Sequence, residues 1–511
     1  MESSPPTNQN PTTETMPTTS PSSSSSNPYP SKLQQISTLS STNLSGSPAW
    51  AATFSIDGQY LAVCFGNPGT HVKIWKYSPS TAPPSARPSI NNTQKEKEVS
   101  NSSGDEWKLI ATIREEHTRT IRSVAFAPTS SSSSQIPILA TASFDGKVLI
   151  WEHYADANDS SNDDYNNGYY DNDDYLDDSN NNSTFEPIAQ LEGHENEIKC
   201  LAWNATGSLL ASCGRDKTIW IWECFLPGTI GGAETSTTNP YGDGDDDDRG
   251  EFECLAVLQG HDGDVKSITF GPSHSQWGEG EEVLYSASYD DTIKVWAEES
   301  GDWYCAATLG GGNSSIPQSL AGGAGAGNGN GGTTIGPVHA STIWCLGLTP
   351  GGVRFFSGSE DGSLAIWKMY TASERKRFFP NSNGNNAICS TDGLWSCVGT
   401  LPEAHSSYAV LSVHCAPSRA GHGRIVSGGG DNCINVYREE TLLSSSSSTS
   451  STDSSSNKNT LDTPQFALDA VADEAHDGDV NDVRWHPIDG TMLVSCGDDG
   501  AVKIWRYIRG G

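Results

Sequence analysis

One short pattern recurs along this chain of 511 residues: an apolar residue, any residue, an apolar residue and an aromatic residue. Six copies end in Trp, and one copy ends in Tyr. The copies end at Trp75, Trp151, Trp222, Trp296, Trp367, Tyr437 and Trp505. A pattern that returns at a near-constant interval indicates an array of similar supersecondary units rather than a series of unrelated domains.

Three polar residues precede each copy from the second to the seventh in a common register. A Ser or Thr lies ten residues before the aromatic residue, an Asp lies six residues before it, and a His lies further upstream. The sets are His117/Thr141/Asp145/Trp151, His194/Ser212/Asp216/Trp222, His261/Ser286/Asp290/Trp296, His339/Ser357/Asp361/Trp367, His405/Ser427/Asp431/Tyr437 and His476/Ser495/Asp499/Trp505. In a four-stranded blade such side chains can hydrogen-bond one another and so satisfy polar groups that folding buries. Because six sets share one register, we interpret them as a structural network and not as catalytic triads.

These repeats predict an all-β fold, a seven-bladed WD-repeat β-propeller over residues 32–511 that follows a disordered N-terminal tail over 1–31. The first repeat has Val63 where the hydroxyl should be and no matching His or Asp, so its blade is expected to lack the network. The segment 32–39 alternates in polarity. We expect it to close the ring as the outer strand of the last blade, which would remove open sheet edges.

The repeats are longer than a propeller blade requires. Successive aromatic markers lie 76, 71, 74, 71, 70 and 68 residues apart, whereas a WD repeat needs about 40 to 45. Low-complexity inserts account for much of the surplus, at about 78–105, 153–186, 225–250, 310–336, 370–392 and 438–464. All but the Gly-rich 310–336 fall between the third and fourth strands of a blade. They would therefore emerge on one face, and we predict that the opposite face binds partners.

Charge, cysteine content and hydropathy exclude several functional classes. The 30 Lys and Arg residues against 63 Asp and Glu give a net charge of −33, which repels nucleic acids and anionic membranes. The 12 Cys residues include no CxxC pair, which argues against a disulfide framework or a local zinc or iron–sulfur site. Neither a membrane-spanning stretch nor a secretory signal is found, so a cytoplasmic or nuclear location is predicted. No nucleophile–base pair or P-loop lies outside the repeated sets, so we predict no enzyme activity, cofactor or metal.

Candidate partner-binding residues lie just before each turn Asp and three to five residues after each His. They are Phe144, Arg215, Tyr289 and Glu360 in the first group, and Arg122, Glu197, Lys199, Lys266 and Trp344 in the second. Exposed aromatic residues and Arg often anchor interfaces. The alternatives are that the aromatic residues pack on neighbouring blades and that the charged residues form a solvated rim. Arg215 is the preferred single candidate because it is a cation in an acidic chain, placed to pair with a carboxylate.

Several repeats also resemble one known family. The stretch Gly193 to Glu223, GHENEIKCLAWNATGSLLASCGRDKTIWIWE, closely resembles the third repeat of the WD-repeat scaffold subunit of the cytosolic iron–sulfur protein assembly (CIA) machinery. The passages EEHTRTIRSVAFAP, SASYDDTIKVWAEE and SCGDDGAVKIWRY fit the same family, and the resemblance extends over all seven repeats. The long inserts and the degenerate first repeat depart from its compact members.

This resemblance implies a non-catalytic scaffold of the CIA targeting complex, which mediates iron–sulfur cluster insertion into cytosolic and nuclear apoproteins. The implied partners are a small acidic CIA subunit, a HEAT-repeat CIA adaptor, an iron-only-hydrogenase-like Fe–S carrier and apo Fe–S client proteins, with no nucleic acid and no membrane. It also implies that Arg215 is a functionally sensitive surface residue. The residues alone leave an alternative, because WD-repeat propellers also serve as substrate receptors or adaptors in ubiquitin-ligase and chromatin complexes.

Overall fold

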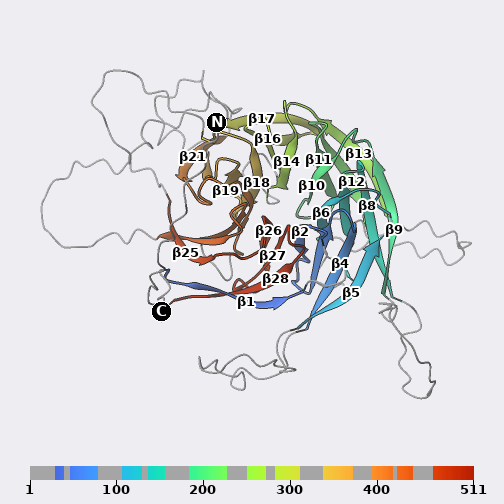
Figure 1. The fold of residues 1–511 in the computed structure, drawn as a ribbon. Helices are drawn as coiled ribbons and strands as arrows, with labels where there is room; N and C mark the ends of the chain where they lie inside the picture. The colour runs from blue at the N-terminus through green and yellow to red at the C-terminus, as the bar shows by residue number, and fades with distance from the viewer. Residues whose placement is uncertain are drawn as a thin grey trace, which may run out of the picture.

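The computed structural model describes residues 29–39, 46–78, 106–114, 116–128, 136–155, 183–226, 250–271, 282–310, 338–371, 393–417, 423–440 and 464–510. These residues form seven four-stranded antiparallel sheets arranged around a central channel. The predicted all-β, seven-bladed β-propeller is confirmed (Figure 1). In the described part of the chain, no helix has the length and apolar character needed to span a membrane.

The four strands of each blade run from the channel outward. Blades 1 and 2 consist of β2 (Ala49–Phe54), β3 (Tyr60–Phe65), β4 (His71–Ser78) and β5 (Glu106–Arg114), then β6 (Ile121–Phe126), β7 (Leu139–Ser143), β8 (Lys147–Ala155) and β9 (Ser183–Glu192). Blades 3 and 4 consist of β10 (Ile198–Trp203), β11 (Leu209–Gly214), β12 (Ile219–Phe225) and β13 (Glu251–Leu258), then β14 (Val265–Phe270), β15 (Val283–Ser288), β16 (Thr292–Glu299) and β17 (Asp302–Gly310).

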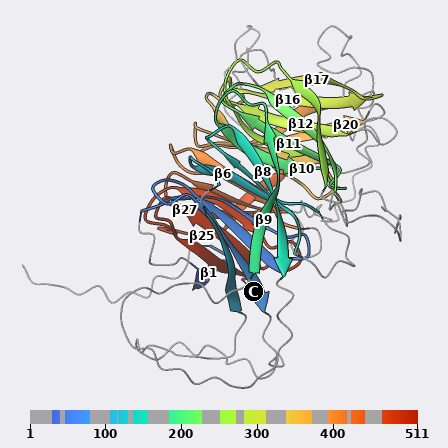
Figure 2. The same ribbon diagram turned by 90° about the vertical axis from the view of Figure 1, so that its right-hand side faces the viewer.

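The last three blades follow the same order. Blades 5 and 6 consist of β18 (Ile343–Leu348), β19 (Arg354–Ser359), β20 (Leu364–Thr371) and β21 (Gly393–Leu401), then β22 (Val410–Cys415), β23 (Arg424–Gly429), β24 (Ile434–Glu440) and β25 (Gln465–Ala472). Blade 7 consists of β26 (Val480–Trp485), β27 (Met492–Gly497), β28 (Val502–Ile508) and β1 (Lys32–Thr38). Figure 2 shows the ring from the side, with the blades stacked against one another.

Burial along the strands follows their place in the blade. The second strands β3, β11 and β15 are buried at every position, because neighbouring blades cover both of their faces, and such strands read as continuous apolar runs. The outer strands β5 and β13 have many exposed or half-buried positions. The described core consists of seven hydrophobic clusters, each of which joins residues of two adjacent blades.

The N-terminal strand β1 forms the outer edge of blade 7. It pairs antiparallel with β28 from Lys32, opposite Ile508, to Thr38, opposite Lys503. The segment 32–39, expected at this edge, therefore supplies a strand there, beside the C-terminal strand in Figure 1. Leu33 is buried in the cluster between blades 6 and 7. The predicted tail over 1–31 lies outside the described residues except for 29–31.

The predicted inserts fall mainly in the gaps between described ranges. The longest gaps are 79–105, 156–182, 227–249, 311–337, 372–392 and 441–463. Strands β8, β9, β20 and β24 extend a few residues into the predicted inserts, because the pairing between third and fourth strands continues beyond the aromatic marker.

The repeated polar residues come together in blades 2, 3, 4 and 7 as a complete chain of hydrogen bonds. The His Nδ1 lies 2.7–3.0 Å from the Asp carboxylate, and the His Nε2 lies 2.7–2.9 Å from the hydroxyl. The Trp indole N–H donates to the same hydroxyl over 2.8–3.0 Å. Burial alone would raise the pKa of Asp145 and Asp216, but hydrogen bonds from His and backbone N–H groups outweigh it and lower both pKa values. The two carboxylates are therefore ionised acceptors at neutral pH.

The hydroxyl at the centre of each set is fully buried in the second strand of its blade. These hydroxyl residues, each with 0% of its surface exposed, are Thr141, Ser212, Ser286, Ser357, Ser427 and Ser495. A hydroxyl at such a position needs partners inside the protein, because water cannot reach it. In all six sets the His Nε2 is one partner, at 2.7–2.9 Å.

Two blades depart from the predicted network. In blade 5, His339 Nδ1 lies 3.0 Å from the Ser363 hydroxyl and 3.8 Å from Asp361, and the Ser363 hydroxyl donates to Asp361, so that it bridges the two side chains. In blade 6, the Tyr437 hydroxyl donates to the Ala404 carbonyl over 2.9 Å instead of to the hydroxyl of its own set. A phenol hydroxyl lies at the far end of its ring, so it reaches past the position where an indole N–H would stop.

The docking of β1 can be tested within that strand. Leu33→Ala should lower the free energy of unfolding by about 2–3 kcal/mol, because the side chain leaves a packed core. Ile36→Ala, at a position that is 42% exposed, should cost less than about 0.5 kcal/mol. Urea denaturation of the full chain measures both values, and equal effects would contradict the burial of Leu33.

The network can be tested at Thr141. Thr141→Val keeps the shape of the side chain but removes the hydroxyl that serves both His117 and Trp151. Because two buried polar groups lose their partner, we expect a loss of about 2–4 kcal/mol in the free energy of unfolding. Thr141→Ser keeps the hydroxyl and should lose only about 1 kcal/mol, the value of one methyl group. A valine variant as stable as the serine variant would show that the network adds nothing.

Candidate functional site

The upper face of the propeller is the end where the turns that carry the repeated His and Asp residues lie. The second residue of each inner strand forms an inner ring around the channel mouth. Its members are Trp50, Arg122, Lys199, Lys266, Trp344, Leu411 and Asn481. The residue before each turn Asp forms an outer ring, made up of Phe144, Arg215, Tyr289, Glu360, Gly430 and Asp498. The fold thus brings residues that are far apart in the sequence together on one surface.

Glu197 gathers three cations on this face. Its Oε1 lies 2.8 Å from Arg119 Nη2 and 3.6 Å from Arg215 Nη1, while its Oε2 lies 2.7 Å from Lys199 Nζ. Burial opposes ionisation of this carboxyl, but hydrogen bonds from Lys199 and Arg119 outweigh it and lower the pKa of Glu197. One carboxylate neutralises only one of the three positive charges, so these four side chains together retain a net positive charge.

Phe144 lies between two of these cations. Lys199 Nζ is 4.0 Å from the centre of its ring, and the Arg119 guanidinium is 5.8 Å from it. Arg119 also donates to the Phe144 carbonyl over 2.6 Å. Such cation–π contacts hold the side chains in one arrangement, so the surface is preorganised. Arg215 remains the most accessible cation of the group, because its side chain is 55% exposed.

A second group continues around the ring on blades 4 and 5. Lys266 Nζ lies 5.5 Å from the ring centre of Tyr289 and 4.8 Å from that of Trp344, and 3.3 Å from Asp264. The Trp344 indole N–H donates to Glu360. Tyr289 is 61% exposed. These contacts extend the basic and aromatic surface from blade 2 to blade 5.

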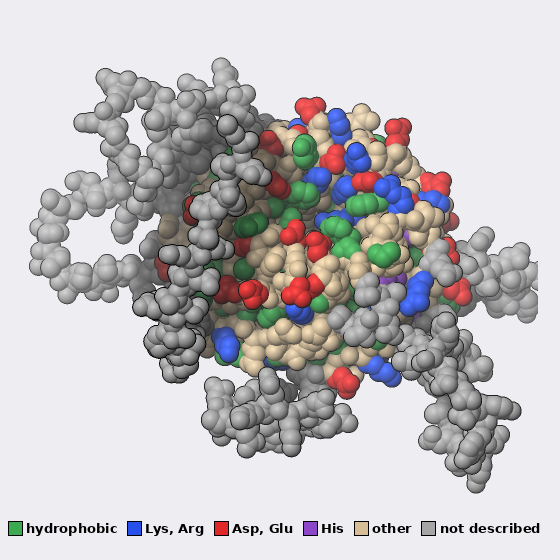
Figure 3. All heavy atoms as spheres, viewed as in Figure 1, with side chains coloured by type: hydrophobic (Ala, Val, Ile, Leu, Met, Phe, Trp, Pro, Cys, Tyr) green, Lys and Arg blue, Asp and Glu red, His purple; other side chains and the backbone are tan. Residues whose placement is uncertain are grey.

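The upper face becomes acidic on the other side of the channel. Asp479 and Asp498 lie there, and Glu360 of the second group borders them: burial raises the pKa of Asp479, and the charges of Asp498 and Glu360 raise it further. Figure 3 shows Lys and Arg side chains gathered with hydrophobic side chains over the region of β10 and β14, and Asp and Glu side chains nearer β26. The upper face therefore has a positively charged half and a negatively charged half, although the whole chain has a net charge of −33.

The structure places all nine predicted partner-binding residues on this face, and eight of them in the two groups above. Arg122 contacts Trp50, with its guanidinium 4.9 Å from the centre of the Trp50 ring, and its charge adds to burial in lowering the pKa of Lys199. Sequence reasoning missed Trp50 and Arg119. Trp50 can be found by aligning the first repeat with the others on its inner strand, because this repeat has no His on which to align it. Arg119 lies two residues after His117, whereas the candidates were taken from three to five residues after each His.

The serine residues of the repeated sets do not belong to this site. Ser212 in β11, Ser286 in β15, Ser357 in β19 and Ser495 in β27 are each 0% exposed, so neither a partner nor a substrate can contact them. Each hydroxyl is also engaged by the indole N–H of its own set, over 2.8–3.0 Å. The structure therefore separates these candidates from the partner-binding residues and assigns them to the interior of the blades alone.

Most long gaps in the described chain lie away from this face. The gaps 79–105, 156–182, 227–249, 372–392 and 441–463 each join a third strand to a fourth strand, whose connected ends lie at the opposite, lower end of the propeller. The gap 311–337 joins β17 to β18 at the upper end, where an insert was expected. The gap 40–45 joins β1 to β2 at the upper end and was not expected.

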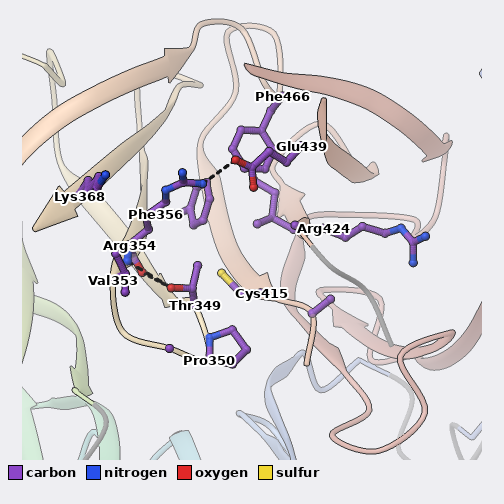
Figure 4. A pocket seen from close by; sticks show the side chains of 14 residues that line it. Thr349, Pro350, Val353, Arg354, Phe356, Lys368, Cys415, Arg424, Glu439 and Phe466 are labelled. Carbon is purple, nitrogen blue, oxygen red and sulfur yellow. Dashed lines mark hydrogen bonds and ion pairs between the residues drawn. The ribbon is translucent and has the colours of Figure 1, made fainter. Parts of the chain in front are cut away.

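A hollow at the lower end lies between blades 5 and 6. Phe356 and Phe466 line its floor, and the ion pair between Arg354 and Glu439, 2.6 Å long, bridges the two blades beside them (Figure 4). The charged end of Arg424 points away from the hollow in this view. The lining also includes Thr349, Lys368 and Arg424 beside apolar side chains. Because the Thr349 hydroxyl already donates to the Arg354 carbonyl and Arg354 is paired with Glu439, these groups point to no ligand class, and the upper face is the better candidate site.

Comparison with known proteins agrees with this architecture. The family described as "WD domain, G-beta repeat" matches residues 107–152, 185–223, 252–297, 333–368 and 471–506. Proteins named "Probable cytosolic iron-sulfur protein assembly protein 1" are similar over much longer stretches. The protein from Debaryomyces hansenii is 31% identical over 78% of this chain and 88% of its own length, and that from Meyerozyma guilliermondii is 30% identical over 87% of this chain and 100% of its own length. This chain belongs to the cytosolic iron–sulfur protein assembly protein 1 family.

Another member, from Chaetomium globosum, is 30% identical over 62% of this chain, and the match spans 64% of that protein, somewhat less than two thirds. The WD-repeat match omits the repeats of blades 1 and 6. Blade 1 lacks the polar network, and blade 6 has Tyr437 in place of Trp, yet both form four-stranded sheets in the structure. Backbone pairing and apolar burial therefore suffice to form a blade where the consensus side chains are missing.

The role of Arg215 can be separated from folding. Arg215→Glu should change the free energy of unfolding by less than about 1 kcal/mol, because the side chain is largely exposed and its contact with Glu197 is long. It should weaken the recovery of protein partners with the tagged full chain about tenfold or more. Lys217→Glu is the matched control, since it makes the same charge change on an exposed residue of the same turn. Equal recovery with the two variants would remove Arg215 from the site.

Proposed function

We propose that this protein is a non-catalytic scaffold of the cytosolic iron–sulfur assembly targeting complex, and that it mediates cluster insertion into cytosolic and nuclear apoproteins by binding other proteins. Family membership and the two-sided upper face support this proposal. The face carries fixed charges and aromatic rings, the residue types that anchor protein interfaces. The cluster is cargo that other components hold, and this chain positions them.

The observation that carries the proposal is the group around Glu197. Three cations and one aromatic ring hold one another in place, so a partner that brings carboxylates meets a preformed surface and loses less conformational freedom on binding. Arg215 offers a planar guanidinium that can donate two parallel hydrogen bonds to one carboxylate. The proposed partners are a small acidic subunit, a HEAT-repeat adaptor, an iron-only-hydrogenase-like carrier and apo client proteins, with neither nucleic acid nor membrane among them. The proposed location is the cytoplasm and the nucleus.

Depletion of the protein from cells tests this function directly. The activity of a cytosolic iron–sulfur enzyme should fall several-fold, while mitochondrial aconitase stays unchanged, because only the cytosolic pathway depends on the scaffold. Wild-type protein and the Lys217→Glu variant should restore the cytosolic activity, and Arg215→Glu should restore it poorly.

Two results would overturn the proposal. Unchanged activity of both enzymes would exclude an assembly role, and the accumulation of a specific client protein in the same cells would favour a ubiquitin-ligase receptor instead. A parallel loss of the cytosolic and mitochondrial activities would place the defect upstream of a cytosolic scaffold.

A further inference from the structure

Each blade contains one facing pair of residues near the channel, formed by the third residue of the inner strand and the next-to-last residue of the second strand. The pairs are Ala51/Cys64, Ser123/Ala142, Cys200/Cys213, Ser267/Ala287, Cys345/Gly358, Ser412/Gly428 and Asp482/Cys496. Among these seven described pairs, only that of blade 3 has cysteine at both positions. The same sheet position thus carries two thiols in one blade and at most one in the others.

The geometry of this pair suits a covalent bond between the sulfurs. Cys200 and Cys213 are paired across the β10–β11 ladder, next to a β-bulge where the register shifts between Ile198 and Cys200. Paired residues of an antiparallel ladder have Cα atoms about 4.5–5.5 Å apart, within the range of about 4.4–6.8 Å that a disulfide requires. Both thiols point toward β14 of blade 4: Cys213 Sγ lies 3.5 Å from the Val265 carbonyl oxygen, and Cys200 Sγ lies 3.8 Å from that of Ile268. Each thiol also influences the ionisation of the other.

The surroundings of the two thiols differ in a way that assigns them different roles. The neighbouring Cys213 thiol lowers the pKa of Cys200 despite burial, and the guanidinium groups of Arg484 and Arg122 lower it further. Cys200 is half-buried and lines the central channel. Burial raises the pKa of Cys213, which is fully buried. Cys200 is therefore the nucleophile that small molecules in the channel can reach, and Cys213 is a neutral thiol held beside it.

We propose that Cys200 and Cys213 form a peroxide-reactive dithiol that closes to a disulfide within blade 3. The Cys200 thiolate attacks one oxygen of hydrogen peroxide, the O–O bond breaks, and hydroxide leaves, which converts the cysteine to a sulfenic acid. Cys213 sulfur then attacks the Cys200 sulfur, the S–O bond breaks, and the released hydroxide takes up the Cys213 thiol proton as water. Two electrons pass from the sulfurs to the peroxide, and a dithiol reductant reverses the change by thiol–disulfide exchange.

The dithiol lies directly beneath the upper-face cations. Lys199 adjoins Cys200, and Arg215 follows Cys213 by two residues, so the disulfide would cross-link the two strands that carry both cations. This modification site goes beyond the proposed function and does not depend on it, because the chemistry requires only the paired thiols and the channel.

Blade 5 supplies an internal control for reactivity. Cys345 occupies the position in β18 that Cys200 occupies in β10, but it faces Gly358 instead of a second thiol. Burial raises the pKa of Cys345 to about 12. Without a partner thiol and with a protonated sulfur, Cys345 should react far more slowly than Cys200.

Peroxide treatment of the purified full-length protein tests the proposal. After treatment, the protein is denatured, the remaining thiols are alkylated with a maleimide, and the masses of the tryptic peptides are measured by mass spectrometry. Cleavage at Lys199 and Arg215 leaves both cysteines on one peptide, Cys200–Arg215. We expect this peptide to lack alkyl groups and to weigh less by two hydrogen atoms than the reduced peptide. The peptide that contains Cys345 should remain alkylated.

Two further measurements keep the proposal falsifiable. The first uses the wild-type protein: maleimide applied to the native reduced chain at neutral pH should label Cys200 at least about tenfold faster than Cys345. In Cys213→Ser, peroxide should leave a sulfenic acid at Cys200 that dimedone traps. A doubly alkylated Cys200–Arg215 peptide after peroxide, or equal labelling rates at the two cysteines, would overturn the proposal.

Discussion

No blade of this propeller can bury its own apolar surface. The second strand of each blade is apolar on both faces, so it needs a neighbour on each side, and the seven clusters of the core all lie between blades. This mutual dependence fixes the ring, and the ring in turn brings the upper ends of the inner strands together around the channel. The cation and aromatic groups of the upper face are a consequence of that closure, since their members come from different blades.

The repeated pattern was enough to predict the seven blades, and the alternation of segment 32–39 was enough to predict the strand that closes the ring, because both depend on spacing alone. Local substitutions set the limit of such prediction. Ser363 bridges His339 and Asp361, and the Tyr437 hydroxyl donates to a backbone carbonyl. Both outcomes depend on the reach of one side chain within a packed turn. Trp50 was missed because its repeat lacks the His used to align the others.

Part of the upper face is positively charged, in contrast to the negative charge of the chain as a whole. The chain carries a net charge of −33, yet Arg119, Lys199 and Arg215 converge on a single carboxylate, and Lys266 lies between two aromatic rings. Overall repulsion discourages nonspecific association between acidic proteins, while the cationic half attracts carboxylates locally. If the proposed function holds, selectivity for acidic partners would follow from this contrast more than from the number of contacts.

The pairing of the first described strand with the last has a consequence for how the protein is made. Tyr507 in β28 donates a hydrogen bond to Ser31 beside β1, across a separation of 476 residues. During synthesis, β1 must wait unpaired until the C-terminal strand has left the ribosome. Contacts of such long range form slowly, and partly folded chains expose strand edges in the meantime. A chain that stops short of β28 would leave the ring open, so the integrity of the whole propeller depends on the synthesis of this one strand.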